Sequence, residues 1–248
     1  ADKEDTVGHV GTIEADRMTP KTGIVVLTGA GVSAESGLGT FRDTGGLWTQ
    51  VNIEEVATPE AFARDPAKVH AFYNMRRAKA RAADPNAAHH ALARLQQARP
   101  DTVLITQNVD DLHERAGAAP IHMHGALAGA LCQACGHRWA APEVMSPDDA
   151  CPGCAARATR PDIVWFGEMP YHMERIAEHL QECDLFVAIG TSGAVYPAAG
   201  FGAEAAMAGA ETLEINLAAS DVSHSFDRHI VGPATQAVPA WVESVLNG

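Results

Sequence analysis

Short apolar runs that end in glycine, serine or amide residues recur along this chain and limit its possible folds more than any other feature. These runs occupy residues 23–31, 101–108, 184–192 and 211–217. Helical patterns lie between and after them, at 86–98, 173–183 and 198–210. Strands that alternate with helices predict a parallel sheet covered on both faces. We therefore expect an α/β fold with a doubly wound parallel sheet, to which residues 235–239 add an edge strand.

Two stretches interrupt this alternation and have the character of inserted modules. Residues 41–85 carry a helical pattern, and residues 126–160 hold four of the five cysteines. We predict that the parallel sheet is formed by 21–40, 86–125 and 161–248, with a helical module at 41–85 and a zinc-binding module at 126–160. Residues 1–20 are acidic and polar, and we predict a flexible N-terminal tail there.

The composition disfavours some classes of function. A net charge of −13 over 248 residues argues against nucleic-acid binding, because phosphate recognition needs a basic surface. No stretch has the apolar length of a membrane span, and the N-terminus has neither signal nor transit character. We expect a cytoplasmic protein that binds neither nucleic acid nor membrane, and we expect it to be a monomer.

The cysteines give the most specific signal in the sequence. Two CxxC pairs, CQAC and CPGC, are separated by fifteen residues. Each CxxC turn can present two thiolates to one ion, and two such turns complete a closed tetrahedral site, so we expect one structural zinc ion. Its predicted ligands are Cys132, Cys135, Cys151 and Cys154. The alternative is two redox or unliganded pairs, and the fifth cysteine, Cys183, is expected to be an ordinary buried thiol.

The sequence GAGVSA (Gly29–Ala34) follows the first predicted strand and matches the pattern G-x-G-x-x-G/A. Glycines in this pattern allow a tight turn and let backbone N–H groups approach a pyrophosphate, although a plain tight turn is the alternative. No acidic residue ends a second strand about twenty positions later, so the context of a hydride-transfer dehydrogenase is missing. A glycine-rich loop with Phe41, Arg42 and Trp48 follows instead. We therefore expect a Rossmann-like site that binds a dinucleotide differently from a dehydrogenase.

Polar side chains gather where the predicted strands end, which is where ligands bind in doubly wound sheets. Gln107, Asn108 and Asp110 suit the carboxamide and hydroxyls of a nicotinamide riboside, although Asp110 can instead cap the next helix. His122 and His124 share a face if their segment is extended and diverge if it turns. His124 precedes a glycine and is the better candidate for a neutral imidazole base in an open cleft.

A helical stretch from Val69 to Ala83 carries four cations within six positions. One stripe of this helix is polar, and we predict that Arg77 and Arg81 on it form a solvated face. The other stripe is apolar apart from Tyr73 and Arg76. A guanidinium on that stripe keeps its charge, so it either reaches water along its aliphatic stem or lies in a pocket that receives an anion.

Together these segments resemble the sirtuin family of NAD-dependent protein-lysine deacylases. The motifs GAGVSAESGLGTFR, TQNVDDLH, HMHG, the two CxxC pairs, FGE, GTS and INL occur in the family's order from about Lys21 onward. ATP, FYxxRR, VWFGE and VYPAA are similar to the bacterial CobB-type and class III, desuccinylase-like, members. The resemblance implies NAD as a co-substrate, one structural zinc ion, and acyl-lysine proteins or peptides as substrates.

The resemblance also implies roles for individual residues. His124 is the implied catalytic base, with Asn108 and Asp110 in the same catalytic group. The implied cofactor-binding residues are Gly29, Ala30, Gly31, Ala34, Glu35, Phe41, Arg42, Trp48, Gln107, Asn108, Val109, Asp110, Gly190, Thr191, Ser192, Asn216, Leu217, Ala218 and Ala234. The implied substrate-binding residues are Tyr73, Arg76, Val164, Phe166, Gly167, Glu168 and Val195. Four of them lie in the segment DIVWFGEMP (Asp162–Pro170), whose own pattern is extended and apolar and predicts either an internal strand or an exposed edge on which a peptide adds as a strand.

In this reading the helical module contains the cofactor loop and the acyl pocket. Tyr73 and Arg76 stand at i and i+3, so one succinyl or malonyl carboxylate can meet both, which implies desuccinylation or demalonylation beside deacetylation. Two positions depart from relatives. Gly39 stands where many relatives have a proline and is expected to loosen the cofactor loop. Ile53 stands where the family member specialised for acidic acyl groups has a smaller residue. The alternatives are a mono-ADP-ribosyltransferase on the same fold, an ordinary NAD dehydrogenase, or a non-enzymatic zinc-ribbon interaction module.

Overall fold

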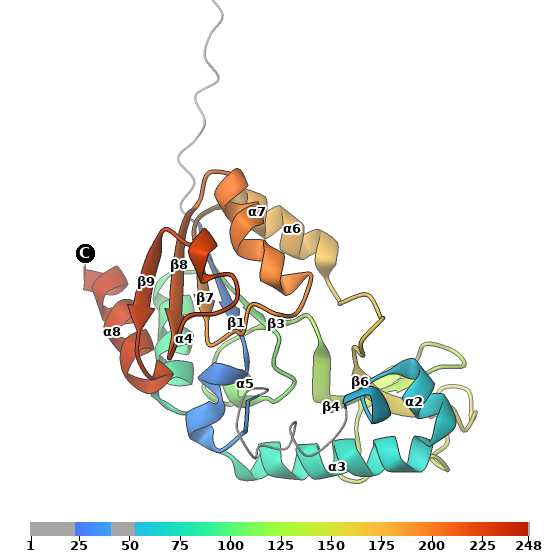
Figure 1. Ribbon diagram of the computed structural model, residues 1–248. Helices are drawn as coiled ribbons and strands as arrows, with labels where there is room; N and C mark the ends of the chain where they lie inside the picture. Colours follow the sequence, from blue (N-terminus) through green and yellow to red (C-terminus); the bar gives the residue numbers. More distant parts are fainter. Residues whose placement is uncertain (1–22, 41–52, 248) are drawn as a thin grey trace, which may run out of the picture.

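A six-stranded parallel sheet forms the centre of the protein in the computed structural model, which describes residues 23–40 and 53–247. The strands are β1 (Gly23–Thr28), β2 (Thr102–Thr106), β3 (Ile121–His122), β7 (Cys183–Ile189), β8 (Glu211–Asn216) and β9 (Arg228–Val231). Their order is β3-β2-β1-β7-β8-β9, and every neighbouring pair is parallel (Figure 1). The predicted Rossmann-like, doubly wound sheet is therefore confirmed. The predicted tail at 1–20 lies outside the described residues, as do 41–52 of the helical module.

Apolar residues on both sides of each central strand explain why this sheet is covered twice. The helices that follow and precede its strands are α4 (Ala87–Ala98), α5 (Leu112–Arg115), α6 (Met173–Glu182), α7 (Phe201–Met207) and α8 (Ala234–Asn247). Val26 of β1 packs in one buried cluster with residues of α4 and α8, whereas its neighbour Val25 packs in a second cluster with residues of α6 and α7. Successive side chains of β1 thus point to opposite faces of the sheet, and helices cover both faces (Figure 1).

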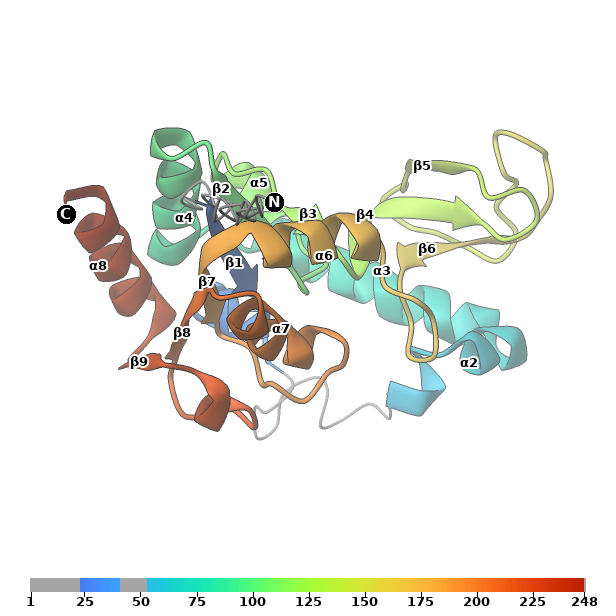
Figure 2. The same cartoon turned by 90° about the horizontal axis from the view of Figure 1, so that it is seen from above.

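A second, smaller lobe lies beside the carboxyl ends of the main strands (Figure 2). It contains an antiparallel sheet in the order β5-β4-β6 and two helices. These elements are β4 (Gly125–Cys132), β5 (Arg138–Ala140), β6 (Thr159–Ile163), α2 (Pro59–Arg64) and α3 (Pro66–Ala82). Residues of α2, α3, β4 and β6 share one buried cluster, which joins the two inserted segments into a single wall opposite the main sheet. Short 3₁₀ turns lie at Ala30–Val32, Ala34–Ser36, Ile53–Glu55, Ala198–Gly200 and Ser223–Ser225.

The edge strand predicted at 235–239 is wrong, because this segment lies inside α8. Its apolar residues continue at helical spacing, with Ala237, Val238, Trp241 and Val242 buried against α4 and the sheet. A five-residue apolar run does not distinguish a strand from a buried helix, and the longer period decides in favour of the helix. The edge strand next to β8 is β9 instead, and β3 forms the other edge of the sheet. No helix of the described chain has the length and apolar character needed to cross a membrane.

The predicted solvated face of α3 is correct for Arg81 and wrong for Arg77. Arg77 is only 2% exposed, and its Nε donates to the backbone oxygen of Leu127 in β4 at 2.7 Å. Its Nη1 donates to Asn74 Oδ1, and its Nη2 contacts Met145 Sδ. The polar stripe of α3 therefore faces the small sheet, where the guanidinium satisfies a backbone carbonyl.

This contact predicts a large difference in stability between two adjacent cations of α3. Arg77→Ala leaves the Leu127 carbonyl without its donor and empties a packed site, so we expect it to lower the free energy of unfolding by about 2–4 kcal/mol. Arg81→Ala removes an exposed ion pair with Glu143 and is expected to cost less than about 1 kcal/mol. Urea unfolding of the two variants measures the difference, and equal midpoints would contradict the buried role of Arg77.

Candidate active site

A cavity of about 990 Å³ lies where the carboxyl ends of β1, β2, β7 and β8 face the small lobe. All the described residues that we predicted to bind cofactor or substrate line it, together with His124. They are Gly29, Ala30, Gly31, Ala34, Glu35, Tyr73, Arg76, Gln107, Asn108, Val109, Asp110, Val164, Phe166, Gly167, Glu168, Gly190, Thr191, Ser192, Val195, Asn216, Leu217, Ala218 and Ala234. Phe41, Arg42 and Trp48 lie outside the described residues. The structure thus brings the predicted cofactor-binding residues and the predicted substrate-binding residues to one cavity.

The floor of the cavity is a direct backbone contact between the loops that follow β1 and β7. Gly31 N donates to Gly190 O at 2.8 Å, and Gly29 N donates to Ile189 O. A Cβ on Gly31 would lie 2.7 Å from Gly190 Cα, and Gly190 itself has φ +61°. The glycines of GAGVSA therefore allow the two loops to touch, in addition to leaving their N–H groups near a ligand. This contact lies at the switch point of the sheet, where β2 and β7 flank β1 on opposite sides.

Thr191 joins three of the strand ends. Gln107, after β2, donates from Nε2 to Thr191 Oγ1 at 2.9 Å, and Asn216, at the end of β8, donates from Nδ2 to Thr191 O at 2.8 Å. Two amides that we predicted as cofactor ligands therefore also brace the loop after β7. Such cross-links hold the strand ends in fixed positions before any ligand arrives.

Ser33 is a central residue of the site that the sequence analysis missed. Asn86 N donates to His89 Nδ1, so His89 carries its hydrogen on Nε2 and donates it to Ser33 Oγ at 3.3 Å. Asn108 Nδ2 also donates to Ser33 Oγ, at 3.2 Å, and Ser33 Oγ donates to Asp110 Oδ2. The serine stands inside GAGVSA, but its partners lie 56 to 77 positions away, and no local pattern reveals them.

Asp110 combines the two roles that the sequence left open. It lines the cavity, and its Oδ1 also accepts from Leu112 N at the start of α5. Burial raises the pKa of Asp110, whereas the hydrogen bonds from Leu112 and Ser33 act in the opposite direction. A carboxylate held by two donors keeps a fixed orientation at the cavity wall.

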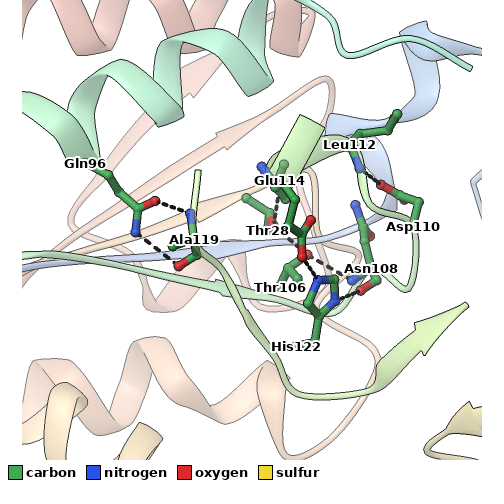
Figure 3. A network of polar contacts seen from close by, with 10 residues as sticks. Thr28, Gln96, Thr106, Asn108, Asp110, Leu112, Glu114, Ala119 and His122 are labelled. Atoms are coloured by element: carbon green, nitrogen blue, oxygen red, sulfur yellow. Dashed lines mark hydrogen bonds and ion pairs between the residues drawn. The ribbon is translucent and has the colours of Figure 1, made fainter. Parts of the chain in front are cut away.

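The two histidines of HMHG diverge because the chain turns after β3. His124 Nδ1 lies 3.2 Å from Gln107 O, and a carbonyl can only accept, so Nδ1 carries the hydrogen. The lone pair of Nε2 is then available in the cavity, and burial lowers the pKa of His124. This imidazole is neutral at pH 7 and is placed to act as a base. His122 instead contacts Glu114 and Asn108 (Figure 3).

Tyr73 and Arg76 meet at the small-lobe side of the cavity. Tyr73 Oη accepts from Trp165 Nε1 at 2.9 Å, so the phenol hydrogen is left to donate. Burial raises the pKa of Tyr73 to about 12, which keeps this hydrogen in place. Arg76 follows one helical turn later, and although burial lowers its pKa, a guanidinium remains charged at neutral pH. A phenol donor and a cation therefore face the same space.

The segment after β6 is held by an ion pair between a buried arginine and a partly exposed glutamate. Arg160, 3% exposed, donates from Nη1 and Nη2 to Glu168 Oε1 and Oε2 at 2.7 and 2.8 Å, and its guanidinium lies 3.4 Å from the centroid of the Trp165 ring. Val164 N donates to His124 O. β6 is an edge strand of the small sheet, and the chain then turns at Gly167 (φ +89°). Glu168, which we predicted to bind substrate, thus holds this turn in shape.

The four cysteines of the CxxC pairs converge as predicted. Their Sγ atoms all lie within 4.8 Å of one another. The Cys132–Cys154 and Cys135–Cys151 pairs are 3.7 and 3.8 Å apart. Zinc–sulfur bonds of about 2.3 Å give a tetrahedron with edges of about 3.8 Å, whereas a disulfide needs about 2.05 Å. The thiols therefore fit one four-coordinate metal ion, and none of them lines the cavity, as expected for a structural site.

Residues 29–197 match the family model described as the Sir2 family. An NAD-dependent protein deacylase of Caulobacter vibrioides is 55% identical over 229 residues, which cover 90% of this chain and 96% of that protein. One of Escherichia coli strain K12 is 50% identical over 242 residues, covering 94% of this chain and 87% of that protein. The chain belongs to the Sir2 family.

Solved structures of Sir2 proteins agree with this assignment. A Sir2 homologue in complex with NAD aligns with a TM-score of 0.83 and 39% identity, covering 90% of this chain and 89% of that one. A Sir2 protein in complex with a p53 peptide and NAD⁺ aligns with a TM-score of 0.70 and 26% identity, covering 91% and 92% of the two chains. The fold of this Sir2 protein is thus similar to that of Sir2 proteins whose structures were solved with NAD.

The metal site leads to a direct prediction about zinc content. We expect the purified protein to carry about one zinc ion per chain and Cys135→Ser to lose it, because three thiolates bind zinc more weakly than four. Zinc is measured by mass spectrometry or with a chromogenic chelator. Cys183→Ser is the matched control, since this buried thiol donates to Leu180 O and does not belong to the cluster. Retention of zinc by Cys135→Ser would argue against this ligand set.

Proposed function

We propose that this protein is an NAD-dependent protein-lysine deacylase that transfers the acyl group to ADP-ribose and releases nicotinamide. The supporting observation is the position of His124. Its neutral imidazole faces a single cavity, which the loops of the parallel sheet line on one side and Tyr73, Arg76 and the segment after β6 line on the other. The names of the relatives at 50–55% identity support the same reaction class.

The proposed reaction begins at the nicotinamide ribose. The acyl carbonyl oxygen of the substrate lysine attacks C1′, and the bond to nicotinamide breaks as nicotinamide leaves. His124 Nε2 takes the proton of a ribose hydroxyl, whose oxygen then attacks the acyl carbon and displaces the lysine amine. The acyl carbon is then bonded to both the C1′ oxygen and the second ribose oxygen. Water adds to this carbon and its bond to the C1′ oxygen breaks, so the products are free lysine, nicotinamide and O-acyl-ADP-ribose. Gly29–Gly31 and Gly190–Ser192 would hold the phosphates, and Asn216–Ala218 with Ala234 would border the adenosine.

We further propose that acidic acyl groups are substrates beside acetyl. Tyr73 can donate one hydrogen bond, and Arg76 can donate two parallel ones, to a single succinyl or malonyl carboxylate. Ile53 packs partly buried against the cluster that contains Tyr73 and does not line the cavity. We therefore expect it to leave both acetyl-lysine and acidic acyl-lysine as substrates. Peptide would lie between the Phe166–Glu168 turn and the loop at Val195.

The reaction class is tested by mass spectrometry of acetyl- and succinyl-lysine peptides incubated with and without NAD. We expect loss of the acyl group only with NAD, with one O-acyl-ADP-ribose formed per lysine released. His124→Ala is expected to abolish turnover, and wild-type activity is expected to fall as the pH drops through the pKa of His124, which lies below its usual 6.5, because protonation removes the base. ADP-ribose attached to protein, NADH formation, or full function of His124→Ala would each support a different class.

The acyl pocket is tested by Arg76→Met, which keeps the volume of the side chain and removes its charge. We expect desuccinylation to fall by about 100-fold or more in kcat/KM, since a charged, bidentate contact to the acyl group is lost. Deacetylation is expected to change less than about threefold, because acetyl has no carboxylate. Arg81→Met, on the exposed face of the same helix, is the matched control. Equal loss of both activities would refute the assignment of Arg76 to the acyl carboxylate.

A further inference from the structure

His122 makes two short contacts that a neutral imidazole cannot satisfy together (Figure 3). Its Nδ1 lies 3.0 Å from Asn108 O, and its Nε2 lies 2.6 Å from Glu114 Oε1. A carbonyl and a carboxylate are both acceptors, so each ring nitrogen must carry a hydrogen. His122 is therefore an imidazolium, and with its side chain 16% exposed it is a mostly buried charge paired with Glu114.

His122 and His124 act on consecutive carbonyls of the same loop. His124 Nδ1 donates to Gln107 O, and His122 Nδ1 donates to Asn108 O. His122 ends β3, whereas His124 lies in the turn that follows; His124 lines the cavity, and His122 pairs with Glu114 of α5. His122 does not line the cavity, and any influence on the reaction passes through the loop that it holds.

Asn108 is the residue on which these contacts converge. Its N–H donates to Thr106 Oγ1 at 3.0 Å, its side-chain Nδ2 donates to Ser33 Oγ, and its carbonyl accepts from His122. Only the third contact carries charge, and charged hydrogen bonds are the stronger kind. Glu114 extends this contact to α5, which begins where Asp110 Oδ1 accepts from Leu112 N (Figure 3). The ion pair therefore fastens the loop 107–111 between β3 and α5.

We propose that His122 and Glu114 form a charged brace that positions Asn108, and through the adjoining Gln107 carbonyl the ring of His124, for the reaction proposed above. This inference rests on the proposed function. His122 is a positioning residue, because it does not line the cavity and acts through Asn108. The brace holds the one segment that carries both a predicted nicotinamide-side amide and the acceptor that fixes the tautomer of the predicted base.

The brace also gives the reaction an alkaline limit. Burial lowers the pKa of His122, but the hydrogen bond and charge of Glu114, with the Asn108 carbonyl and Asp110, raise it above its usual value overall. The other titratable group of the described chain that faces His122 is His113, which stays neutral because burial lowers its pKa to about 3. When the pH rises through the pKa of His122, one ring nitrogen loses its hydrogen and then opposes an acceptor with a lone pair.

The test compares His122→Ala, His122→Asn and Glu114→Gln with a His90→Ala control, an exposed histidine of α4. Steady-state kinetics with NAD are recorded from about pH 5 to about pH 9. We expect His122→Ala to lower kcat/KM for NAD by about 10- to 100-fold, the scale of a small misplacement of catalytic groups. His122→Asn keeps a donor for Asn108 O, so it should recover most of this loss and show no alkaline limb.

Glu114→Gln gives the sharper result, because it leaves both rings in place. We expect its alkaline limb to move to lower pH while the acid limb, which belongs to His124, does not move. NMR titration of the imidazoles should show the His122 pKa falling in this variant. Thermal unfolding identifies any variant that has lost its fold, and the conclusion then rests on Glu114→Gln.

ADP-ribose affinity separates this proposal from the proposed function. If the wild-type protein shows no NAD-dependent acyl transfer, the function is wrong, yet the brace still predicts weaker ADP-ribose binding by His122→Ala than by His90→Ala. If acyl transfer occurs but His122→Ala and Glu114→Gln match His90→Ala in kcat/KM, pH profile and ADP-ribose affinity, the brace is refuted and the function stands.

Discussion

The contact between the Gly31 and Gly190 backbones is the constraint on which the rest of the site depends. Because neither residue has a Cβ, the loops after β1 and β7 approach until Gly31 N donates to Gly190 O at 2.8 Å. This closeness brings Thr191 within reach of the amides of Gln107 and Asn216, so four neighbouring strand ends become one unit. A side chain at either glycine would separate the loops and, with them, both halves of the predicted cofactor site.

Around this unit, several polar side chains use their hydrogen bonds within the described part of the protein, and two atoms face the cavity. Ser33 accepts from His89 and Asn108 and donates to Asp110, so its hydrogen-bonding capacity is used within the protein. His124 Nε2 and the hydroxyl hydrogen of Tyr73 are left facing the cavity. Burial keeps the first unprotonated and the second protonated, so one accepts and the other donates at neutral pH. Fixed partners on one side of each group thus determine what it offers on the other.

Sequence patterns predicted the parts of the structure that depend on neighbours in the chain. Apolar runs, glycine turns and CxxC pairs are local, and the sheet, the strand-end cavity and the cysteine cluster follow from them. Three features escaped prediction, two of them because they depend on distant contacts. Arg77 looked solvated because its carbonyl partner, Leu127, is 50 positions away. Ser33 received no role of its own because its partners lie 56 to 77 positions away. Residues 235–239 were predicted as a strand because the helix period emerges only beyond five residues.

The small lobe contributes more than the metal site, because it fixes the distance across the cavity. Arg77 joins α3 to β4, and the Arg160–Glu168 pair joins β6 to the turn that carries Phe166. The first tie spans 50 positions and the second spans 8, and the pairing of β4 with β6 joins them into one wall. Val164 N connects this wall to the backbone of His124. His124, the predicted base, is therefore held from both lobes at once: its ring is oriented by the loop after β2, and its backbone by the residue that follows β6. Any change that shifts one lobe against the other must move His124 relative to one of the two groups of residues that meet in the cavity.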